Sequence, residues 1–506
     1  MTSPGPPTRA RTTRSTGILL VLLLLVGSAC TTDGDDRSRS EDRSRDQSGP
    51  LEQPGPSGRP DPFEQLPAVE PHLIDVPDQV FPGRGDPRID VIHYDLEVRA
   101  DLDDPTVRGR SRIELRPLTA EPLTSFTLDL RGPEVETVTI DGDEATASTD
   151  DHVGQVIIEP EKPLAPGRTS ELIISWAGRP ASEEFPTLEV PIGWRSDDHG
   201  GWFTLAQPDG TSTWAPVNDH PSDKATWRIA LDTPAELTGV SNGELAASSV
   251  HNDRRRWVWE TREPMAPHVL LAAVGDYRLV ERSGSGGVPI TLAVHSSVDD
   301  ALVEGFDEVE EIIAFFTDTF GEYPASSGGA IVVPVDLGLA LETQSRPTFG
   351  TDGVARDHVW ALAHELAHEW FGNAVTPVSW EDLWLSESFA TYADWLWLDH
   401  SGIQDIDDLA AAAERSTGRL AVLDVEAAAT FDNMVYEGGA RALHGLRHQV
   451  GDDAFFDILS TWYEEHRGGS ASTADFILLA ERVSGEDMAN WSEDWLESVD
   501  QPDLPR

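Results

Sequence analysis

The sequence predicts a chain with two folded parts, a β-rich domain followed by a mainly helical one. From about Ile89 to Val240, apolar residues alternate with polar ones in short runs, as in Tyr94, Leu96 and Val98, and Gly, Pro or Asp turns separate the runs. This alternation is typical of half-buried strands at short spacing. We therefore expect a β-sandwich or saddle in the first part. Beyond residue 300 the apolar spacing becomes helical.

Three segments of the second part have the signature of helices. Apolar residues recur at helical spacing over 301–320, which Gly321 follows, and 354–371 contains no Gly or Pro before Gly372. The segment 405–417 is rich in Ala. Glycine is favoured just after a helix, so these positions predict where the helices end. Between the first two helices, 330–335 reads as a buried strand.

The strongest chemical signal is a pair of histidines with metal-ligand spacing. His364 and His368 lie four residues apart, so on a helix their imidazoles project from one face and can bind one Zn²⁺, with Glu365 beside them. Glu387, on the apolar helix that follows, is a candidate third ligand, and a catalytic zinc needs three. Thr391 and Asp394, on the same helix, are candidates to support this ligand, although for Asp394 we favour a solvent-facing position. From the pentapeptide alone, a solvated His and Glu face stays open.

At this point the sequence resembles the M1 family of zinc aminopeptidases. Eighteen residues separate His368 from Glu387, and the chain reads His-Glu-Trp-Phe-Gly-Asn-x-Val-Thr-Pro and then Trp-x-Asp-Leu-Trp-Leu, as that family does. The resemblance implies a multidomain β plus α/β fold, with an N-terminal β domain before a thermolysin-like, mainly helical catalytic domain. One departure lies at the third ligand, where Ser386 and Ser388 flank Glu387 in place of Asn and Gly.

The resemblance also implies roles for other residues. Glu365 would act as the general base, and Tyr436 would stabilise the oxyanion. Glu342 would bind the free α-amine of a peptide, and Gln207 or Asp209 would help to hold it. The family writes Gly-x-Met-Glu-Asn around the residue that matches Glu342, whereas this chain reads Leu-Ala-Leu-Glu-Thr. Tyr436 also lacks the cation that often follows it in the family.

The implied function is a zinc aminopeptidase with one Zn²⁺ per chain, acting on peptides with a free N-terminus. Two alternatives remain open at this point. An endopeptidase or an epoxide hydrolase could use the same zinc site, and a surface protein could bind zinc or peptides without cutting them. We expect a short form of the family, without the C-terminal helical domain of longer members and with a more open cleft.

The composition argues against two classes of partner. The chain has 506 residues, 90 acidic against 37 basic, and a net charge of −53, and Lys162 and Lys224 are its two lysines. Such a surface repels nucleic acid and anionic lipid headgroups. We interpret the acidic residues as a solubilising coat.

The N-terminus has the pattern of an export signal. Arg9, Arg11 and Arg14 precede an apolar run at 17–26, and small residues lead to Cys30, the single cysteine. This order is that of a signal peptide over 1–30. Its end resembles a lipobox, which implies a protein secreted and lipid-anchored through Cys30 to the outer face of a bacterial cell membrane, although a plain secretory signal stays open.

The remaining boundaries follow from composition. The segment 31–80 is rich in Asp, Arg, Ser and Pro and has few apolar residues, so we expect a disordered tether. The β domain is expected over 81–280 and the catalytic domain over 281–506.

Overall fold

A computed structural model describes residues 78–100, 106–150, 152–185, 188, 190–299, 303–353, 359–416, 420–426 and 430–504. All of them belong to one compact unit, 65–506. The expected signal segment with Cys30, and the tether as far as residue 77, lie outside the described residues. Among the helices that the structure describes, none combines the length and the apolar character needed to cross a bilayer.

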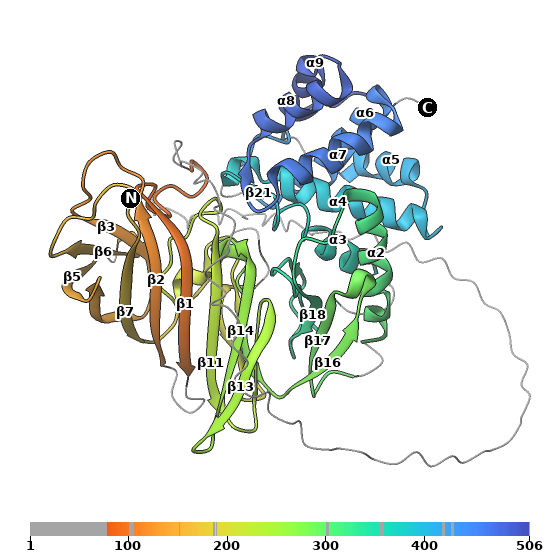
Figure 1. Ribbon diagram of the computed structural model, residues 1–506. Helices are drawn as coiled ribbons and strands as arrows, with labels where there is room; N and C mark the ends of the chain where they lie inside the picture. Colours follow the sequence, from red (N-terminus) through yellow and green to blue (C-terminus); the bar gives the residue numbers. More distant parts are fainter. Residues whose placement is uncertain are drawn as a thin grey trace, which may run out of the picture. The chain divides into compact units, whose positions relative to one another are not determined.

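The β-rich domain is built on a ten-stranded sheet (Figure 1). Its strands lie in the order β13-β14-β11-β1-β2-β7-β4-β5-β6-β3. Their bounds are β1 (Ile89–Ala100), β2 (Val107–Pro117), β3 (Phe126–Asp129), β4 (Glu134–Ile140), β5 (Asp143–Asp150), β6 (Gln155–Pro160), β7 (Ser170–Gly178), β11 (Ala225–Pro234), β13 (Glu244–His251) and β14 (Arg254–Met265). Neighbours pair antiparallel except β1 and β11, which are parallel.

The centre of this sheet shows why the alternating sequence folds as it does. In β1, residues such as Val91 and Leu96 are buried, but the burial phase changes where the pairing with β2 shifts between Val91 and His93. A bulge of this kind re-aims the following side chains. Tyr94 is thereby buried, and its ring stacks on Trp227 of β11 with centroids 4.0 Å apart.

A second sheet completes the β domain. Its five strands lie in the order β12-β15-β10-β9-β8. Their bounds are β8 (Ser182–Glu183), β9 (Ile192–Ser196), β10 (Trp202–Leu205), β12 (Thr238–Ser241) and β15 (Ala272–Gly275). The two sheets confirm the expected β-rich domain.

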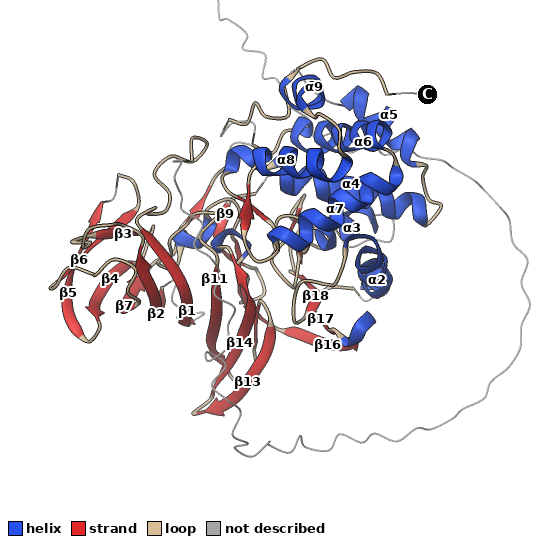
Figure 2. Ribbon diagram, turned by 45° about the horizontal axis from the view of Figure 1, so that its top comes forward, coloured by secondary structure: helices blue, strands red, loops and turns tan. Residues whose placement is uncertain are grey.

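The second, mainly helical domain, which we expect to be catalytic, combines a third, five-stranded sheet with a group of helices, which Figure 2 shows in blue. The sheet order is β16-β17-β18-β20-β19, and β21 and β22 form a separate pair. The strands are β16 (Tyr277–Ser283), β17 (Pro289–His295), β18 (Gly328–Val332), β19 (Ala340–Leu341), β20 (Thr348–Phe349), β21 (Thr376–Pro377) and β22 (Ser470–Ala471). The helices are α2 (Val309–Phe320), α3 (Val359–Ala367), α4 (Trp384–His400), α5 (Ile406–Ser416), α6 (Gly439–Val450), α7 (Asp452–His466), α8 (Thr473–Ser484) and α9 (Ala489–Ser492).

Three apolar clusters form the core. One lies mainly among the helices. Another lies along the ten-stranded sheet and includes residues of the second sheet. The third joins the second sheet to the third, because Phe203 and Leu205 of β10 share it with Ile331 of β18 and Leu341 of β19. The end of β10 is therefore packed against the strands that lead to Glu342.

Helix lengths differ from the expectations at two places. Over 301–320, the described part begins as a 3₁₀ turn, η5 (Glu304–Glu308), before α2; Gly305 weakens helix formation there. Over 354–371, α3 ends at Ala367 and the chain turns before Gly372. The expected domain boundary, between 280 and 281, falls inside β16.

Candidate metal centre and active site

Three side chains converge at the end of α3. His364 lies on α3, His368 in the turn just after it, and Glu387 on α4. The two Nε2 atoms are 3.1 Å apart, and each is 3.4 Å from Glu387 Oε2. Ligands of a tetrahedral zinc at 2.0–2.1 Å are about 3.3 Å from one another. The donor set and its spacing therefore fit one Zn²⁺.

The contacts at His368 Nε2 also favour a metal. This nitrogen faces both His364 Nε2 and Glu387 Oε2, yet an imidazole nitrogen offers one proton or one lone pair. A cation between the three atoms satisfies all of them. On the outer side of the rings, His368 Nδ1 lies 3.0 Å from Phe371 O and 3.1 Å from Ser386 Oγ.

Asp394 orients the other imidazole. Its Oδ2 lies 3.3 Å from His364 Nδ1, and its side chain is buried. The expectation that Asp394 faces solvent was therefore wrong. Asp394 lies two helical turns after Glu387, on the same face of a helix that is buried almost throughout. A carboxylate in this position fixes the tautomer and the orientation of a ligand histidine.

The electrostatics of the cluster favour a positive charge. Burial opposes ionisation of Glu387, but His368 and His364 outweigh it and hold the pKa of Glu387 at about 2. Burial likewise opposes the imidazolium form of His364, yet the carboxylates of Asp394 and Glu387 outweigh it and raise the pKa of His364. Since these buried carboxylates stabilise a proton, they also stabilise a divalent cation.

Glu365 and Tyr436 lie beside the metal ligands. Burial raises the pKa of Glu365 to about 7, against the opposing charges of His364 and His368. Its Oε2 is buried and accepts no hydrogen bond from the residues that the structure describes. Tyr436, in the π-turn η8 (Met434–Gly438), has its ring nearly parallel to that of His364, with centroids 6.0 Å apart. Burial, reinforced by the charge of Glu387, raises the pKa of Tyr436, which keeps the phenol protonated.

Glu342 lies at the edge of the third sheet. It directly follows β19, the last strand in the sheet order, and its side chain is buried. Gln207, just after β10, donates from Nε2 to Glu342 Oε1 at 2.5 Å. Asn373 donates to the Glu342 backbone carbonyl at 2.9 Å. The β domain and the catalytic domain therefore meet at this carboxylate.

Asp209 is engaged elsewhere. Its Oδ2 lies 2.7 Å from Arg84 Nε, and its Oδ1 lies 3.1 Å from Arg131 Nη2. Both carboxylate oxygens are thus paired with arginines. Of the two residues predicted to assist Glu342, the structure favours Gln207.

Two positioning residues were not predicted. Asn373 belongs to the Phe-Gly-Asn sequence that carried the resemblance, but nothing in the pattern indicated its contact with Glu342. Lys224, buried in the β domain, donates to the carbonyls of Asn373 (2.7 Å), Ala374 (2.9 Å) and Gly469 (3.2 Å). The sequence feature that could have drawn attention to Lys224 is that it is one of only two lysines in an acidic chain.

Close contacts surround the two serines, Ser386 and Ser388, that replace the family's Asn and Gly on either side of Glu387. Ser388 donates from Oγ to Val435 O, next to Tyr436, and a Cβ on Gly439 would lie 1.8 Å from that hydroxyl. Gly372, at φ +117°, lets the chain pass Ser386, because a Cβ there would lie 2.3 Å from Ser386 Oγ. Both serines therefore tie Glu387 to its neighbours.

Comparisons with known proteins agree with this arrangement. The Peptidase M1 N-terminal domain matches residues 91–268, and the Peptidase family M1 domain matches residues 346–495. The M1 zinc metallopeptidase of Deinococcus radiodurans has a solved structure that is 30% identical, with a TM-score of 0.79 over 85% of this chain and 98% of that one. The chain belongs to the M1 family of peptidases.

Several M1 relatives are called aminopeptidases. Aminopeptidase N of Streptomyces lividans is 26% identical over 81% of this chain, and aminopeptidase 2 of Candida albicans is 25% identical over 81%. The chain spans about half the length of these curated relatives, 50% and 47% respectively. A further structure of the Deinococcus radiodurans enzyme, in a mutant form, is bound to a Tyr-Ser-Ala substrate, and it has the same identity and TM-score.

Proposed function

We propose that this M1 chain is a zinc-dependent aminopeptidase that removes N-terminal residues from peptides. The observation that carries the proposal is the contact of Gln207 with Glu342, beside the group formed by His364, His368 and Glu387. Burial raises the pKa of Glu342, so a cationic partner is needed to hold its carboxylate ionised. The α-ammonium of a peptide is such a partner.

Each group of residues at the site has a separate role in the proposed hydrolysis. Zn²⁺, held by the two histidines and Glu387, would lower the pKa of a water molecule and polarise the scissile carbonyl. Glu365, with a pKa near neutrality, accepts the proton of the attacking water and donates it to the leaving amine. The protonated phenol of Tyr436 donates a hydrogen bond to the developing oxyanion.

Direction along the substrate comes from Glu342. β19 is the edge strand of its sheet in the described structure, so a peptide can extend the sheet as an added strand. Glu342 would then hold the free amine at the end of that strand, and only the first peptide bond would reach Glu365. An endopeptidase needs no such carboxylate.

Hydrolysis of aminoacyl anilides tests this function. We expect activity that a chelator abolishes and Zn²⁺ restores, with little cutting of N-acetylated peptides. A charge-assisted hydrogen bond contributes about 1.5–3 kcal/mol, so Glu342→Gln should lower kcat/KM by about 10- to 100-fold. Activity that persists in chelator would refute the zinc hydrolase, and equal cutting of N-acetylated peptides would refute the exopeptidase.

We also propose that the protein is exported and lipid-anchored through Cys30. The support is the order of Arg residues, apolar run and small residues before that single cysteine. In a bacterial host, Cys30→Ala should release the protein from the membrane fraction. Unchanged fractionation of the variant would contradict a lipid anchor.

A further inference from the structure

A second group of side chains with the chemistry of metal ligands lies between α5 and α6. His444 and His448 lie four residues apart on α6, and Asp407 lies in the first turn of α5. Figures 1 and 2 both show these two helices side by side. None of the three residues contributes to the site described above.

The three possible ligand atoms of this group all lie within 4.8 Å of one another. His448 Nε2 lies 3.1 Å from His444 Nε2, and Asp407 Oδ1 lies 3.1 Å from the same nitrogen. Two groups thus converge on His444 Nε2, which offers one lone pair or one proton. At the catalytic site, His368 Nε2 faces His364 Nε2 and Glu387 Oε2 in the same way.

The surroundings prepare His444 as a ligand. Tyr392 Oη of α4 lies 3.1 Å from His444 Nδ1 and can accept its N–H, which leaves the lone pair on Nε2. Burial lowers the pKa of His444 to about 4, so the imidazole is neutral at physiological pH. Arg447 lies nearby, but it pairs with Asp452 through contacts of 2.8 and 3.0 Å, which compensates its charge.

We propose that Asp407, His444 and His448 bind a second divalent transition-metal ion, of which Zn²⁺ is the representative. Two imidazoles with one carboxylate suit Zn²⁺, Co²⁺, Ni²⁺ or Cu²⁺, whereas Mg²⁺ and Ca²⁺ require oxygen ligands. Asp407 and His448 are exposed, so the ion exchanges with solvent and water completes its coordination. It joins α5 to α6 and, through Tyr392, to the helix that carries Glu387.

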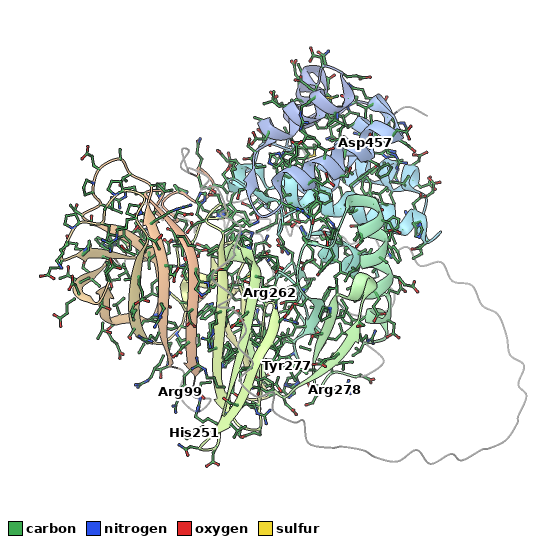
Figure 3. The ribbon with its side chains drawn as sticks, in the orientation of Figure 1. Arg99, His251, Arg262, Tyr277, Arg278 and Asp457 are labelled. Atoms are coloured by element: carbon green, nitrogen blue, oxygen red, sulfur yellow. The ribbon has the colours of Figure 1, made fainter. Side chains whose placement is uncertain are left out.

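Zinc stoichiometry of the whole chain tests the proposal without any peptide substrate. We expect two Zn²⁺ per chain in the wild type, measured by isothermal titration and metal analysis after dialysis. His448→Gln and Asp407→Asn should each weaken the second site by about tenfold or more, leaving one tight ion. His251→Gln is the control: this exposed residue ends β13 and is labelled in Figure 3, and its loss should leave two ions.

Two further experiments distinguish the second site from the catalytic one and a transition metal from Mg²⁺. His368→Ala should abolish the catalytic site and keep binding at the second, and Co²⁺ added to this variant should give a ligand-field absorption that His448→Gln removes. Excess Mg²⁺ should not displace the ion. One Zn²⁺ per wild-type chain, two tightly bound ions in His448→Gln, or displacement by Mg²⁺ would each overturn the proposal, whatever the outcome of the peptidase assay.

Discussion

Asp394 offers a direct test of how the metal centre is held. Its Oδ2 is 3.3 Å from His364 Nδ1, on the side of the ring away from Glu387. Loss of such a partner weakens metal binding by about 10- to 100-fold, or roughly 1.4–2.7 kcal/mol. The amide oxygen of Asn can still accept a hydrogen bond from the imidazole N–H, so Asp394→Asn should lower the affinity for Zn²⁺ about tenfold. Asp394→Ala leaves the buried N–H of His364 without an acceptor and should lower the affinity for Zn²⁺ about 100-fold.

The assay is competition for Zn²⁺ with a chelator of known affinity, in a His448→Gln background so that only the catalytic site is measured. Asp399→Asn is the matched control, because Asp399 lies on the same helix but is exposed. Its zinc affinity should equal that of the parent. If Asp394→Ala bound Zn²⁺ within a factor of two of the parent, the orienting role would be refuted.

Three more outcomes are expected. Glu365→Gln should lower kcat by about 10²- to 10⁴-fold while zinc content, measured by metal analysis, stays unchanged; lost zinc would show a structural role instead. Gly439→Ala should destabilise the fold by about 1–3 kcal/mol in urea unfolding, because its Cβ meets the Ser388 hydroxyl, and adding Ser388→Gly should recover part of the loss. Burial, reinforced by nearby carboxylates, raises the pKa of Asp219 to about 7, so folding stability falls as pH rises from about 4 through 7. Asp219→Asn should therefore stabilise the protein at pH 8 and have little effect at pH 4; equal effects at both would contradict the shift.

The sequence predicted the parts of the site that local periodicity determines. His364 and His368 share a helix face because of their spacing, and Glu387 follows on a helix that apolar residues marked. Asp394 was misjudged for a physical reason: α4 is buried on nearly every side, so a charged residue there needs a partner, and the sequence does not reveal which face packs where.

Contacts between distant segments could not be predicted in the same way. Gln207 and Glu342 are 135 positions apart, and Lys224 and Gly469 are 245 apart. Sheet order brings these residues together, and order depends on how whole strands pair rather than on any local pattern. The resemblance named Gln207 and Asp209 equally, and only the pairing of Asp209 with two arginines separates them.

Gln207 and Glu342 come from different domains, which separates the part of the site that contacts Glu342 from the part that binds the metal. The zinc ligands and Glu365 all lie in the helical domain, whereas Gln207 reaches Glu342 from the β domain. Under the proposed function, mutations near Gln207 would therefore alter which peptide ends are accepted and leave the zinc ligands and Glu365 unchanged.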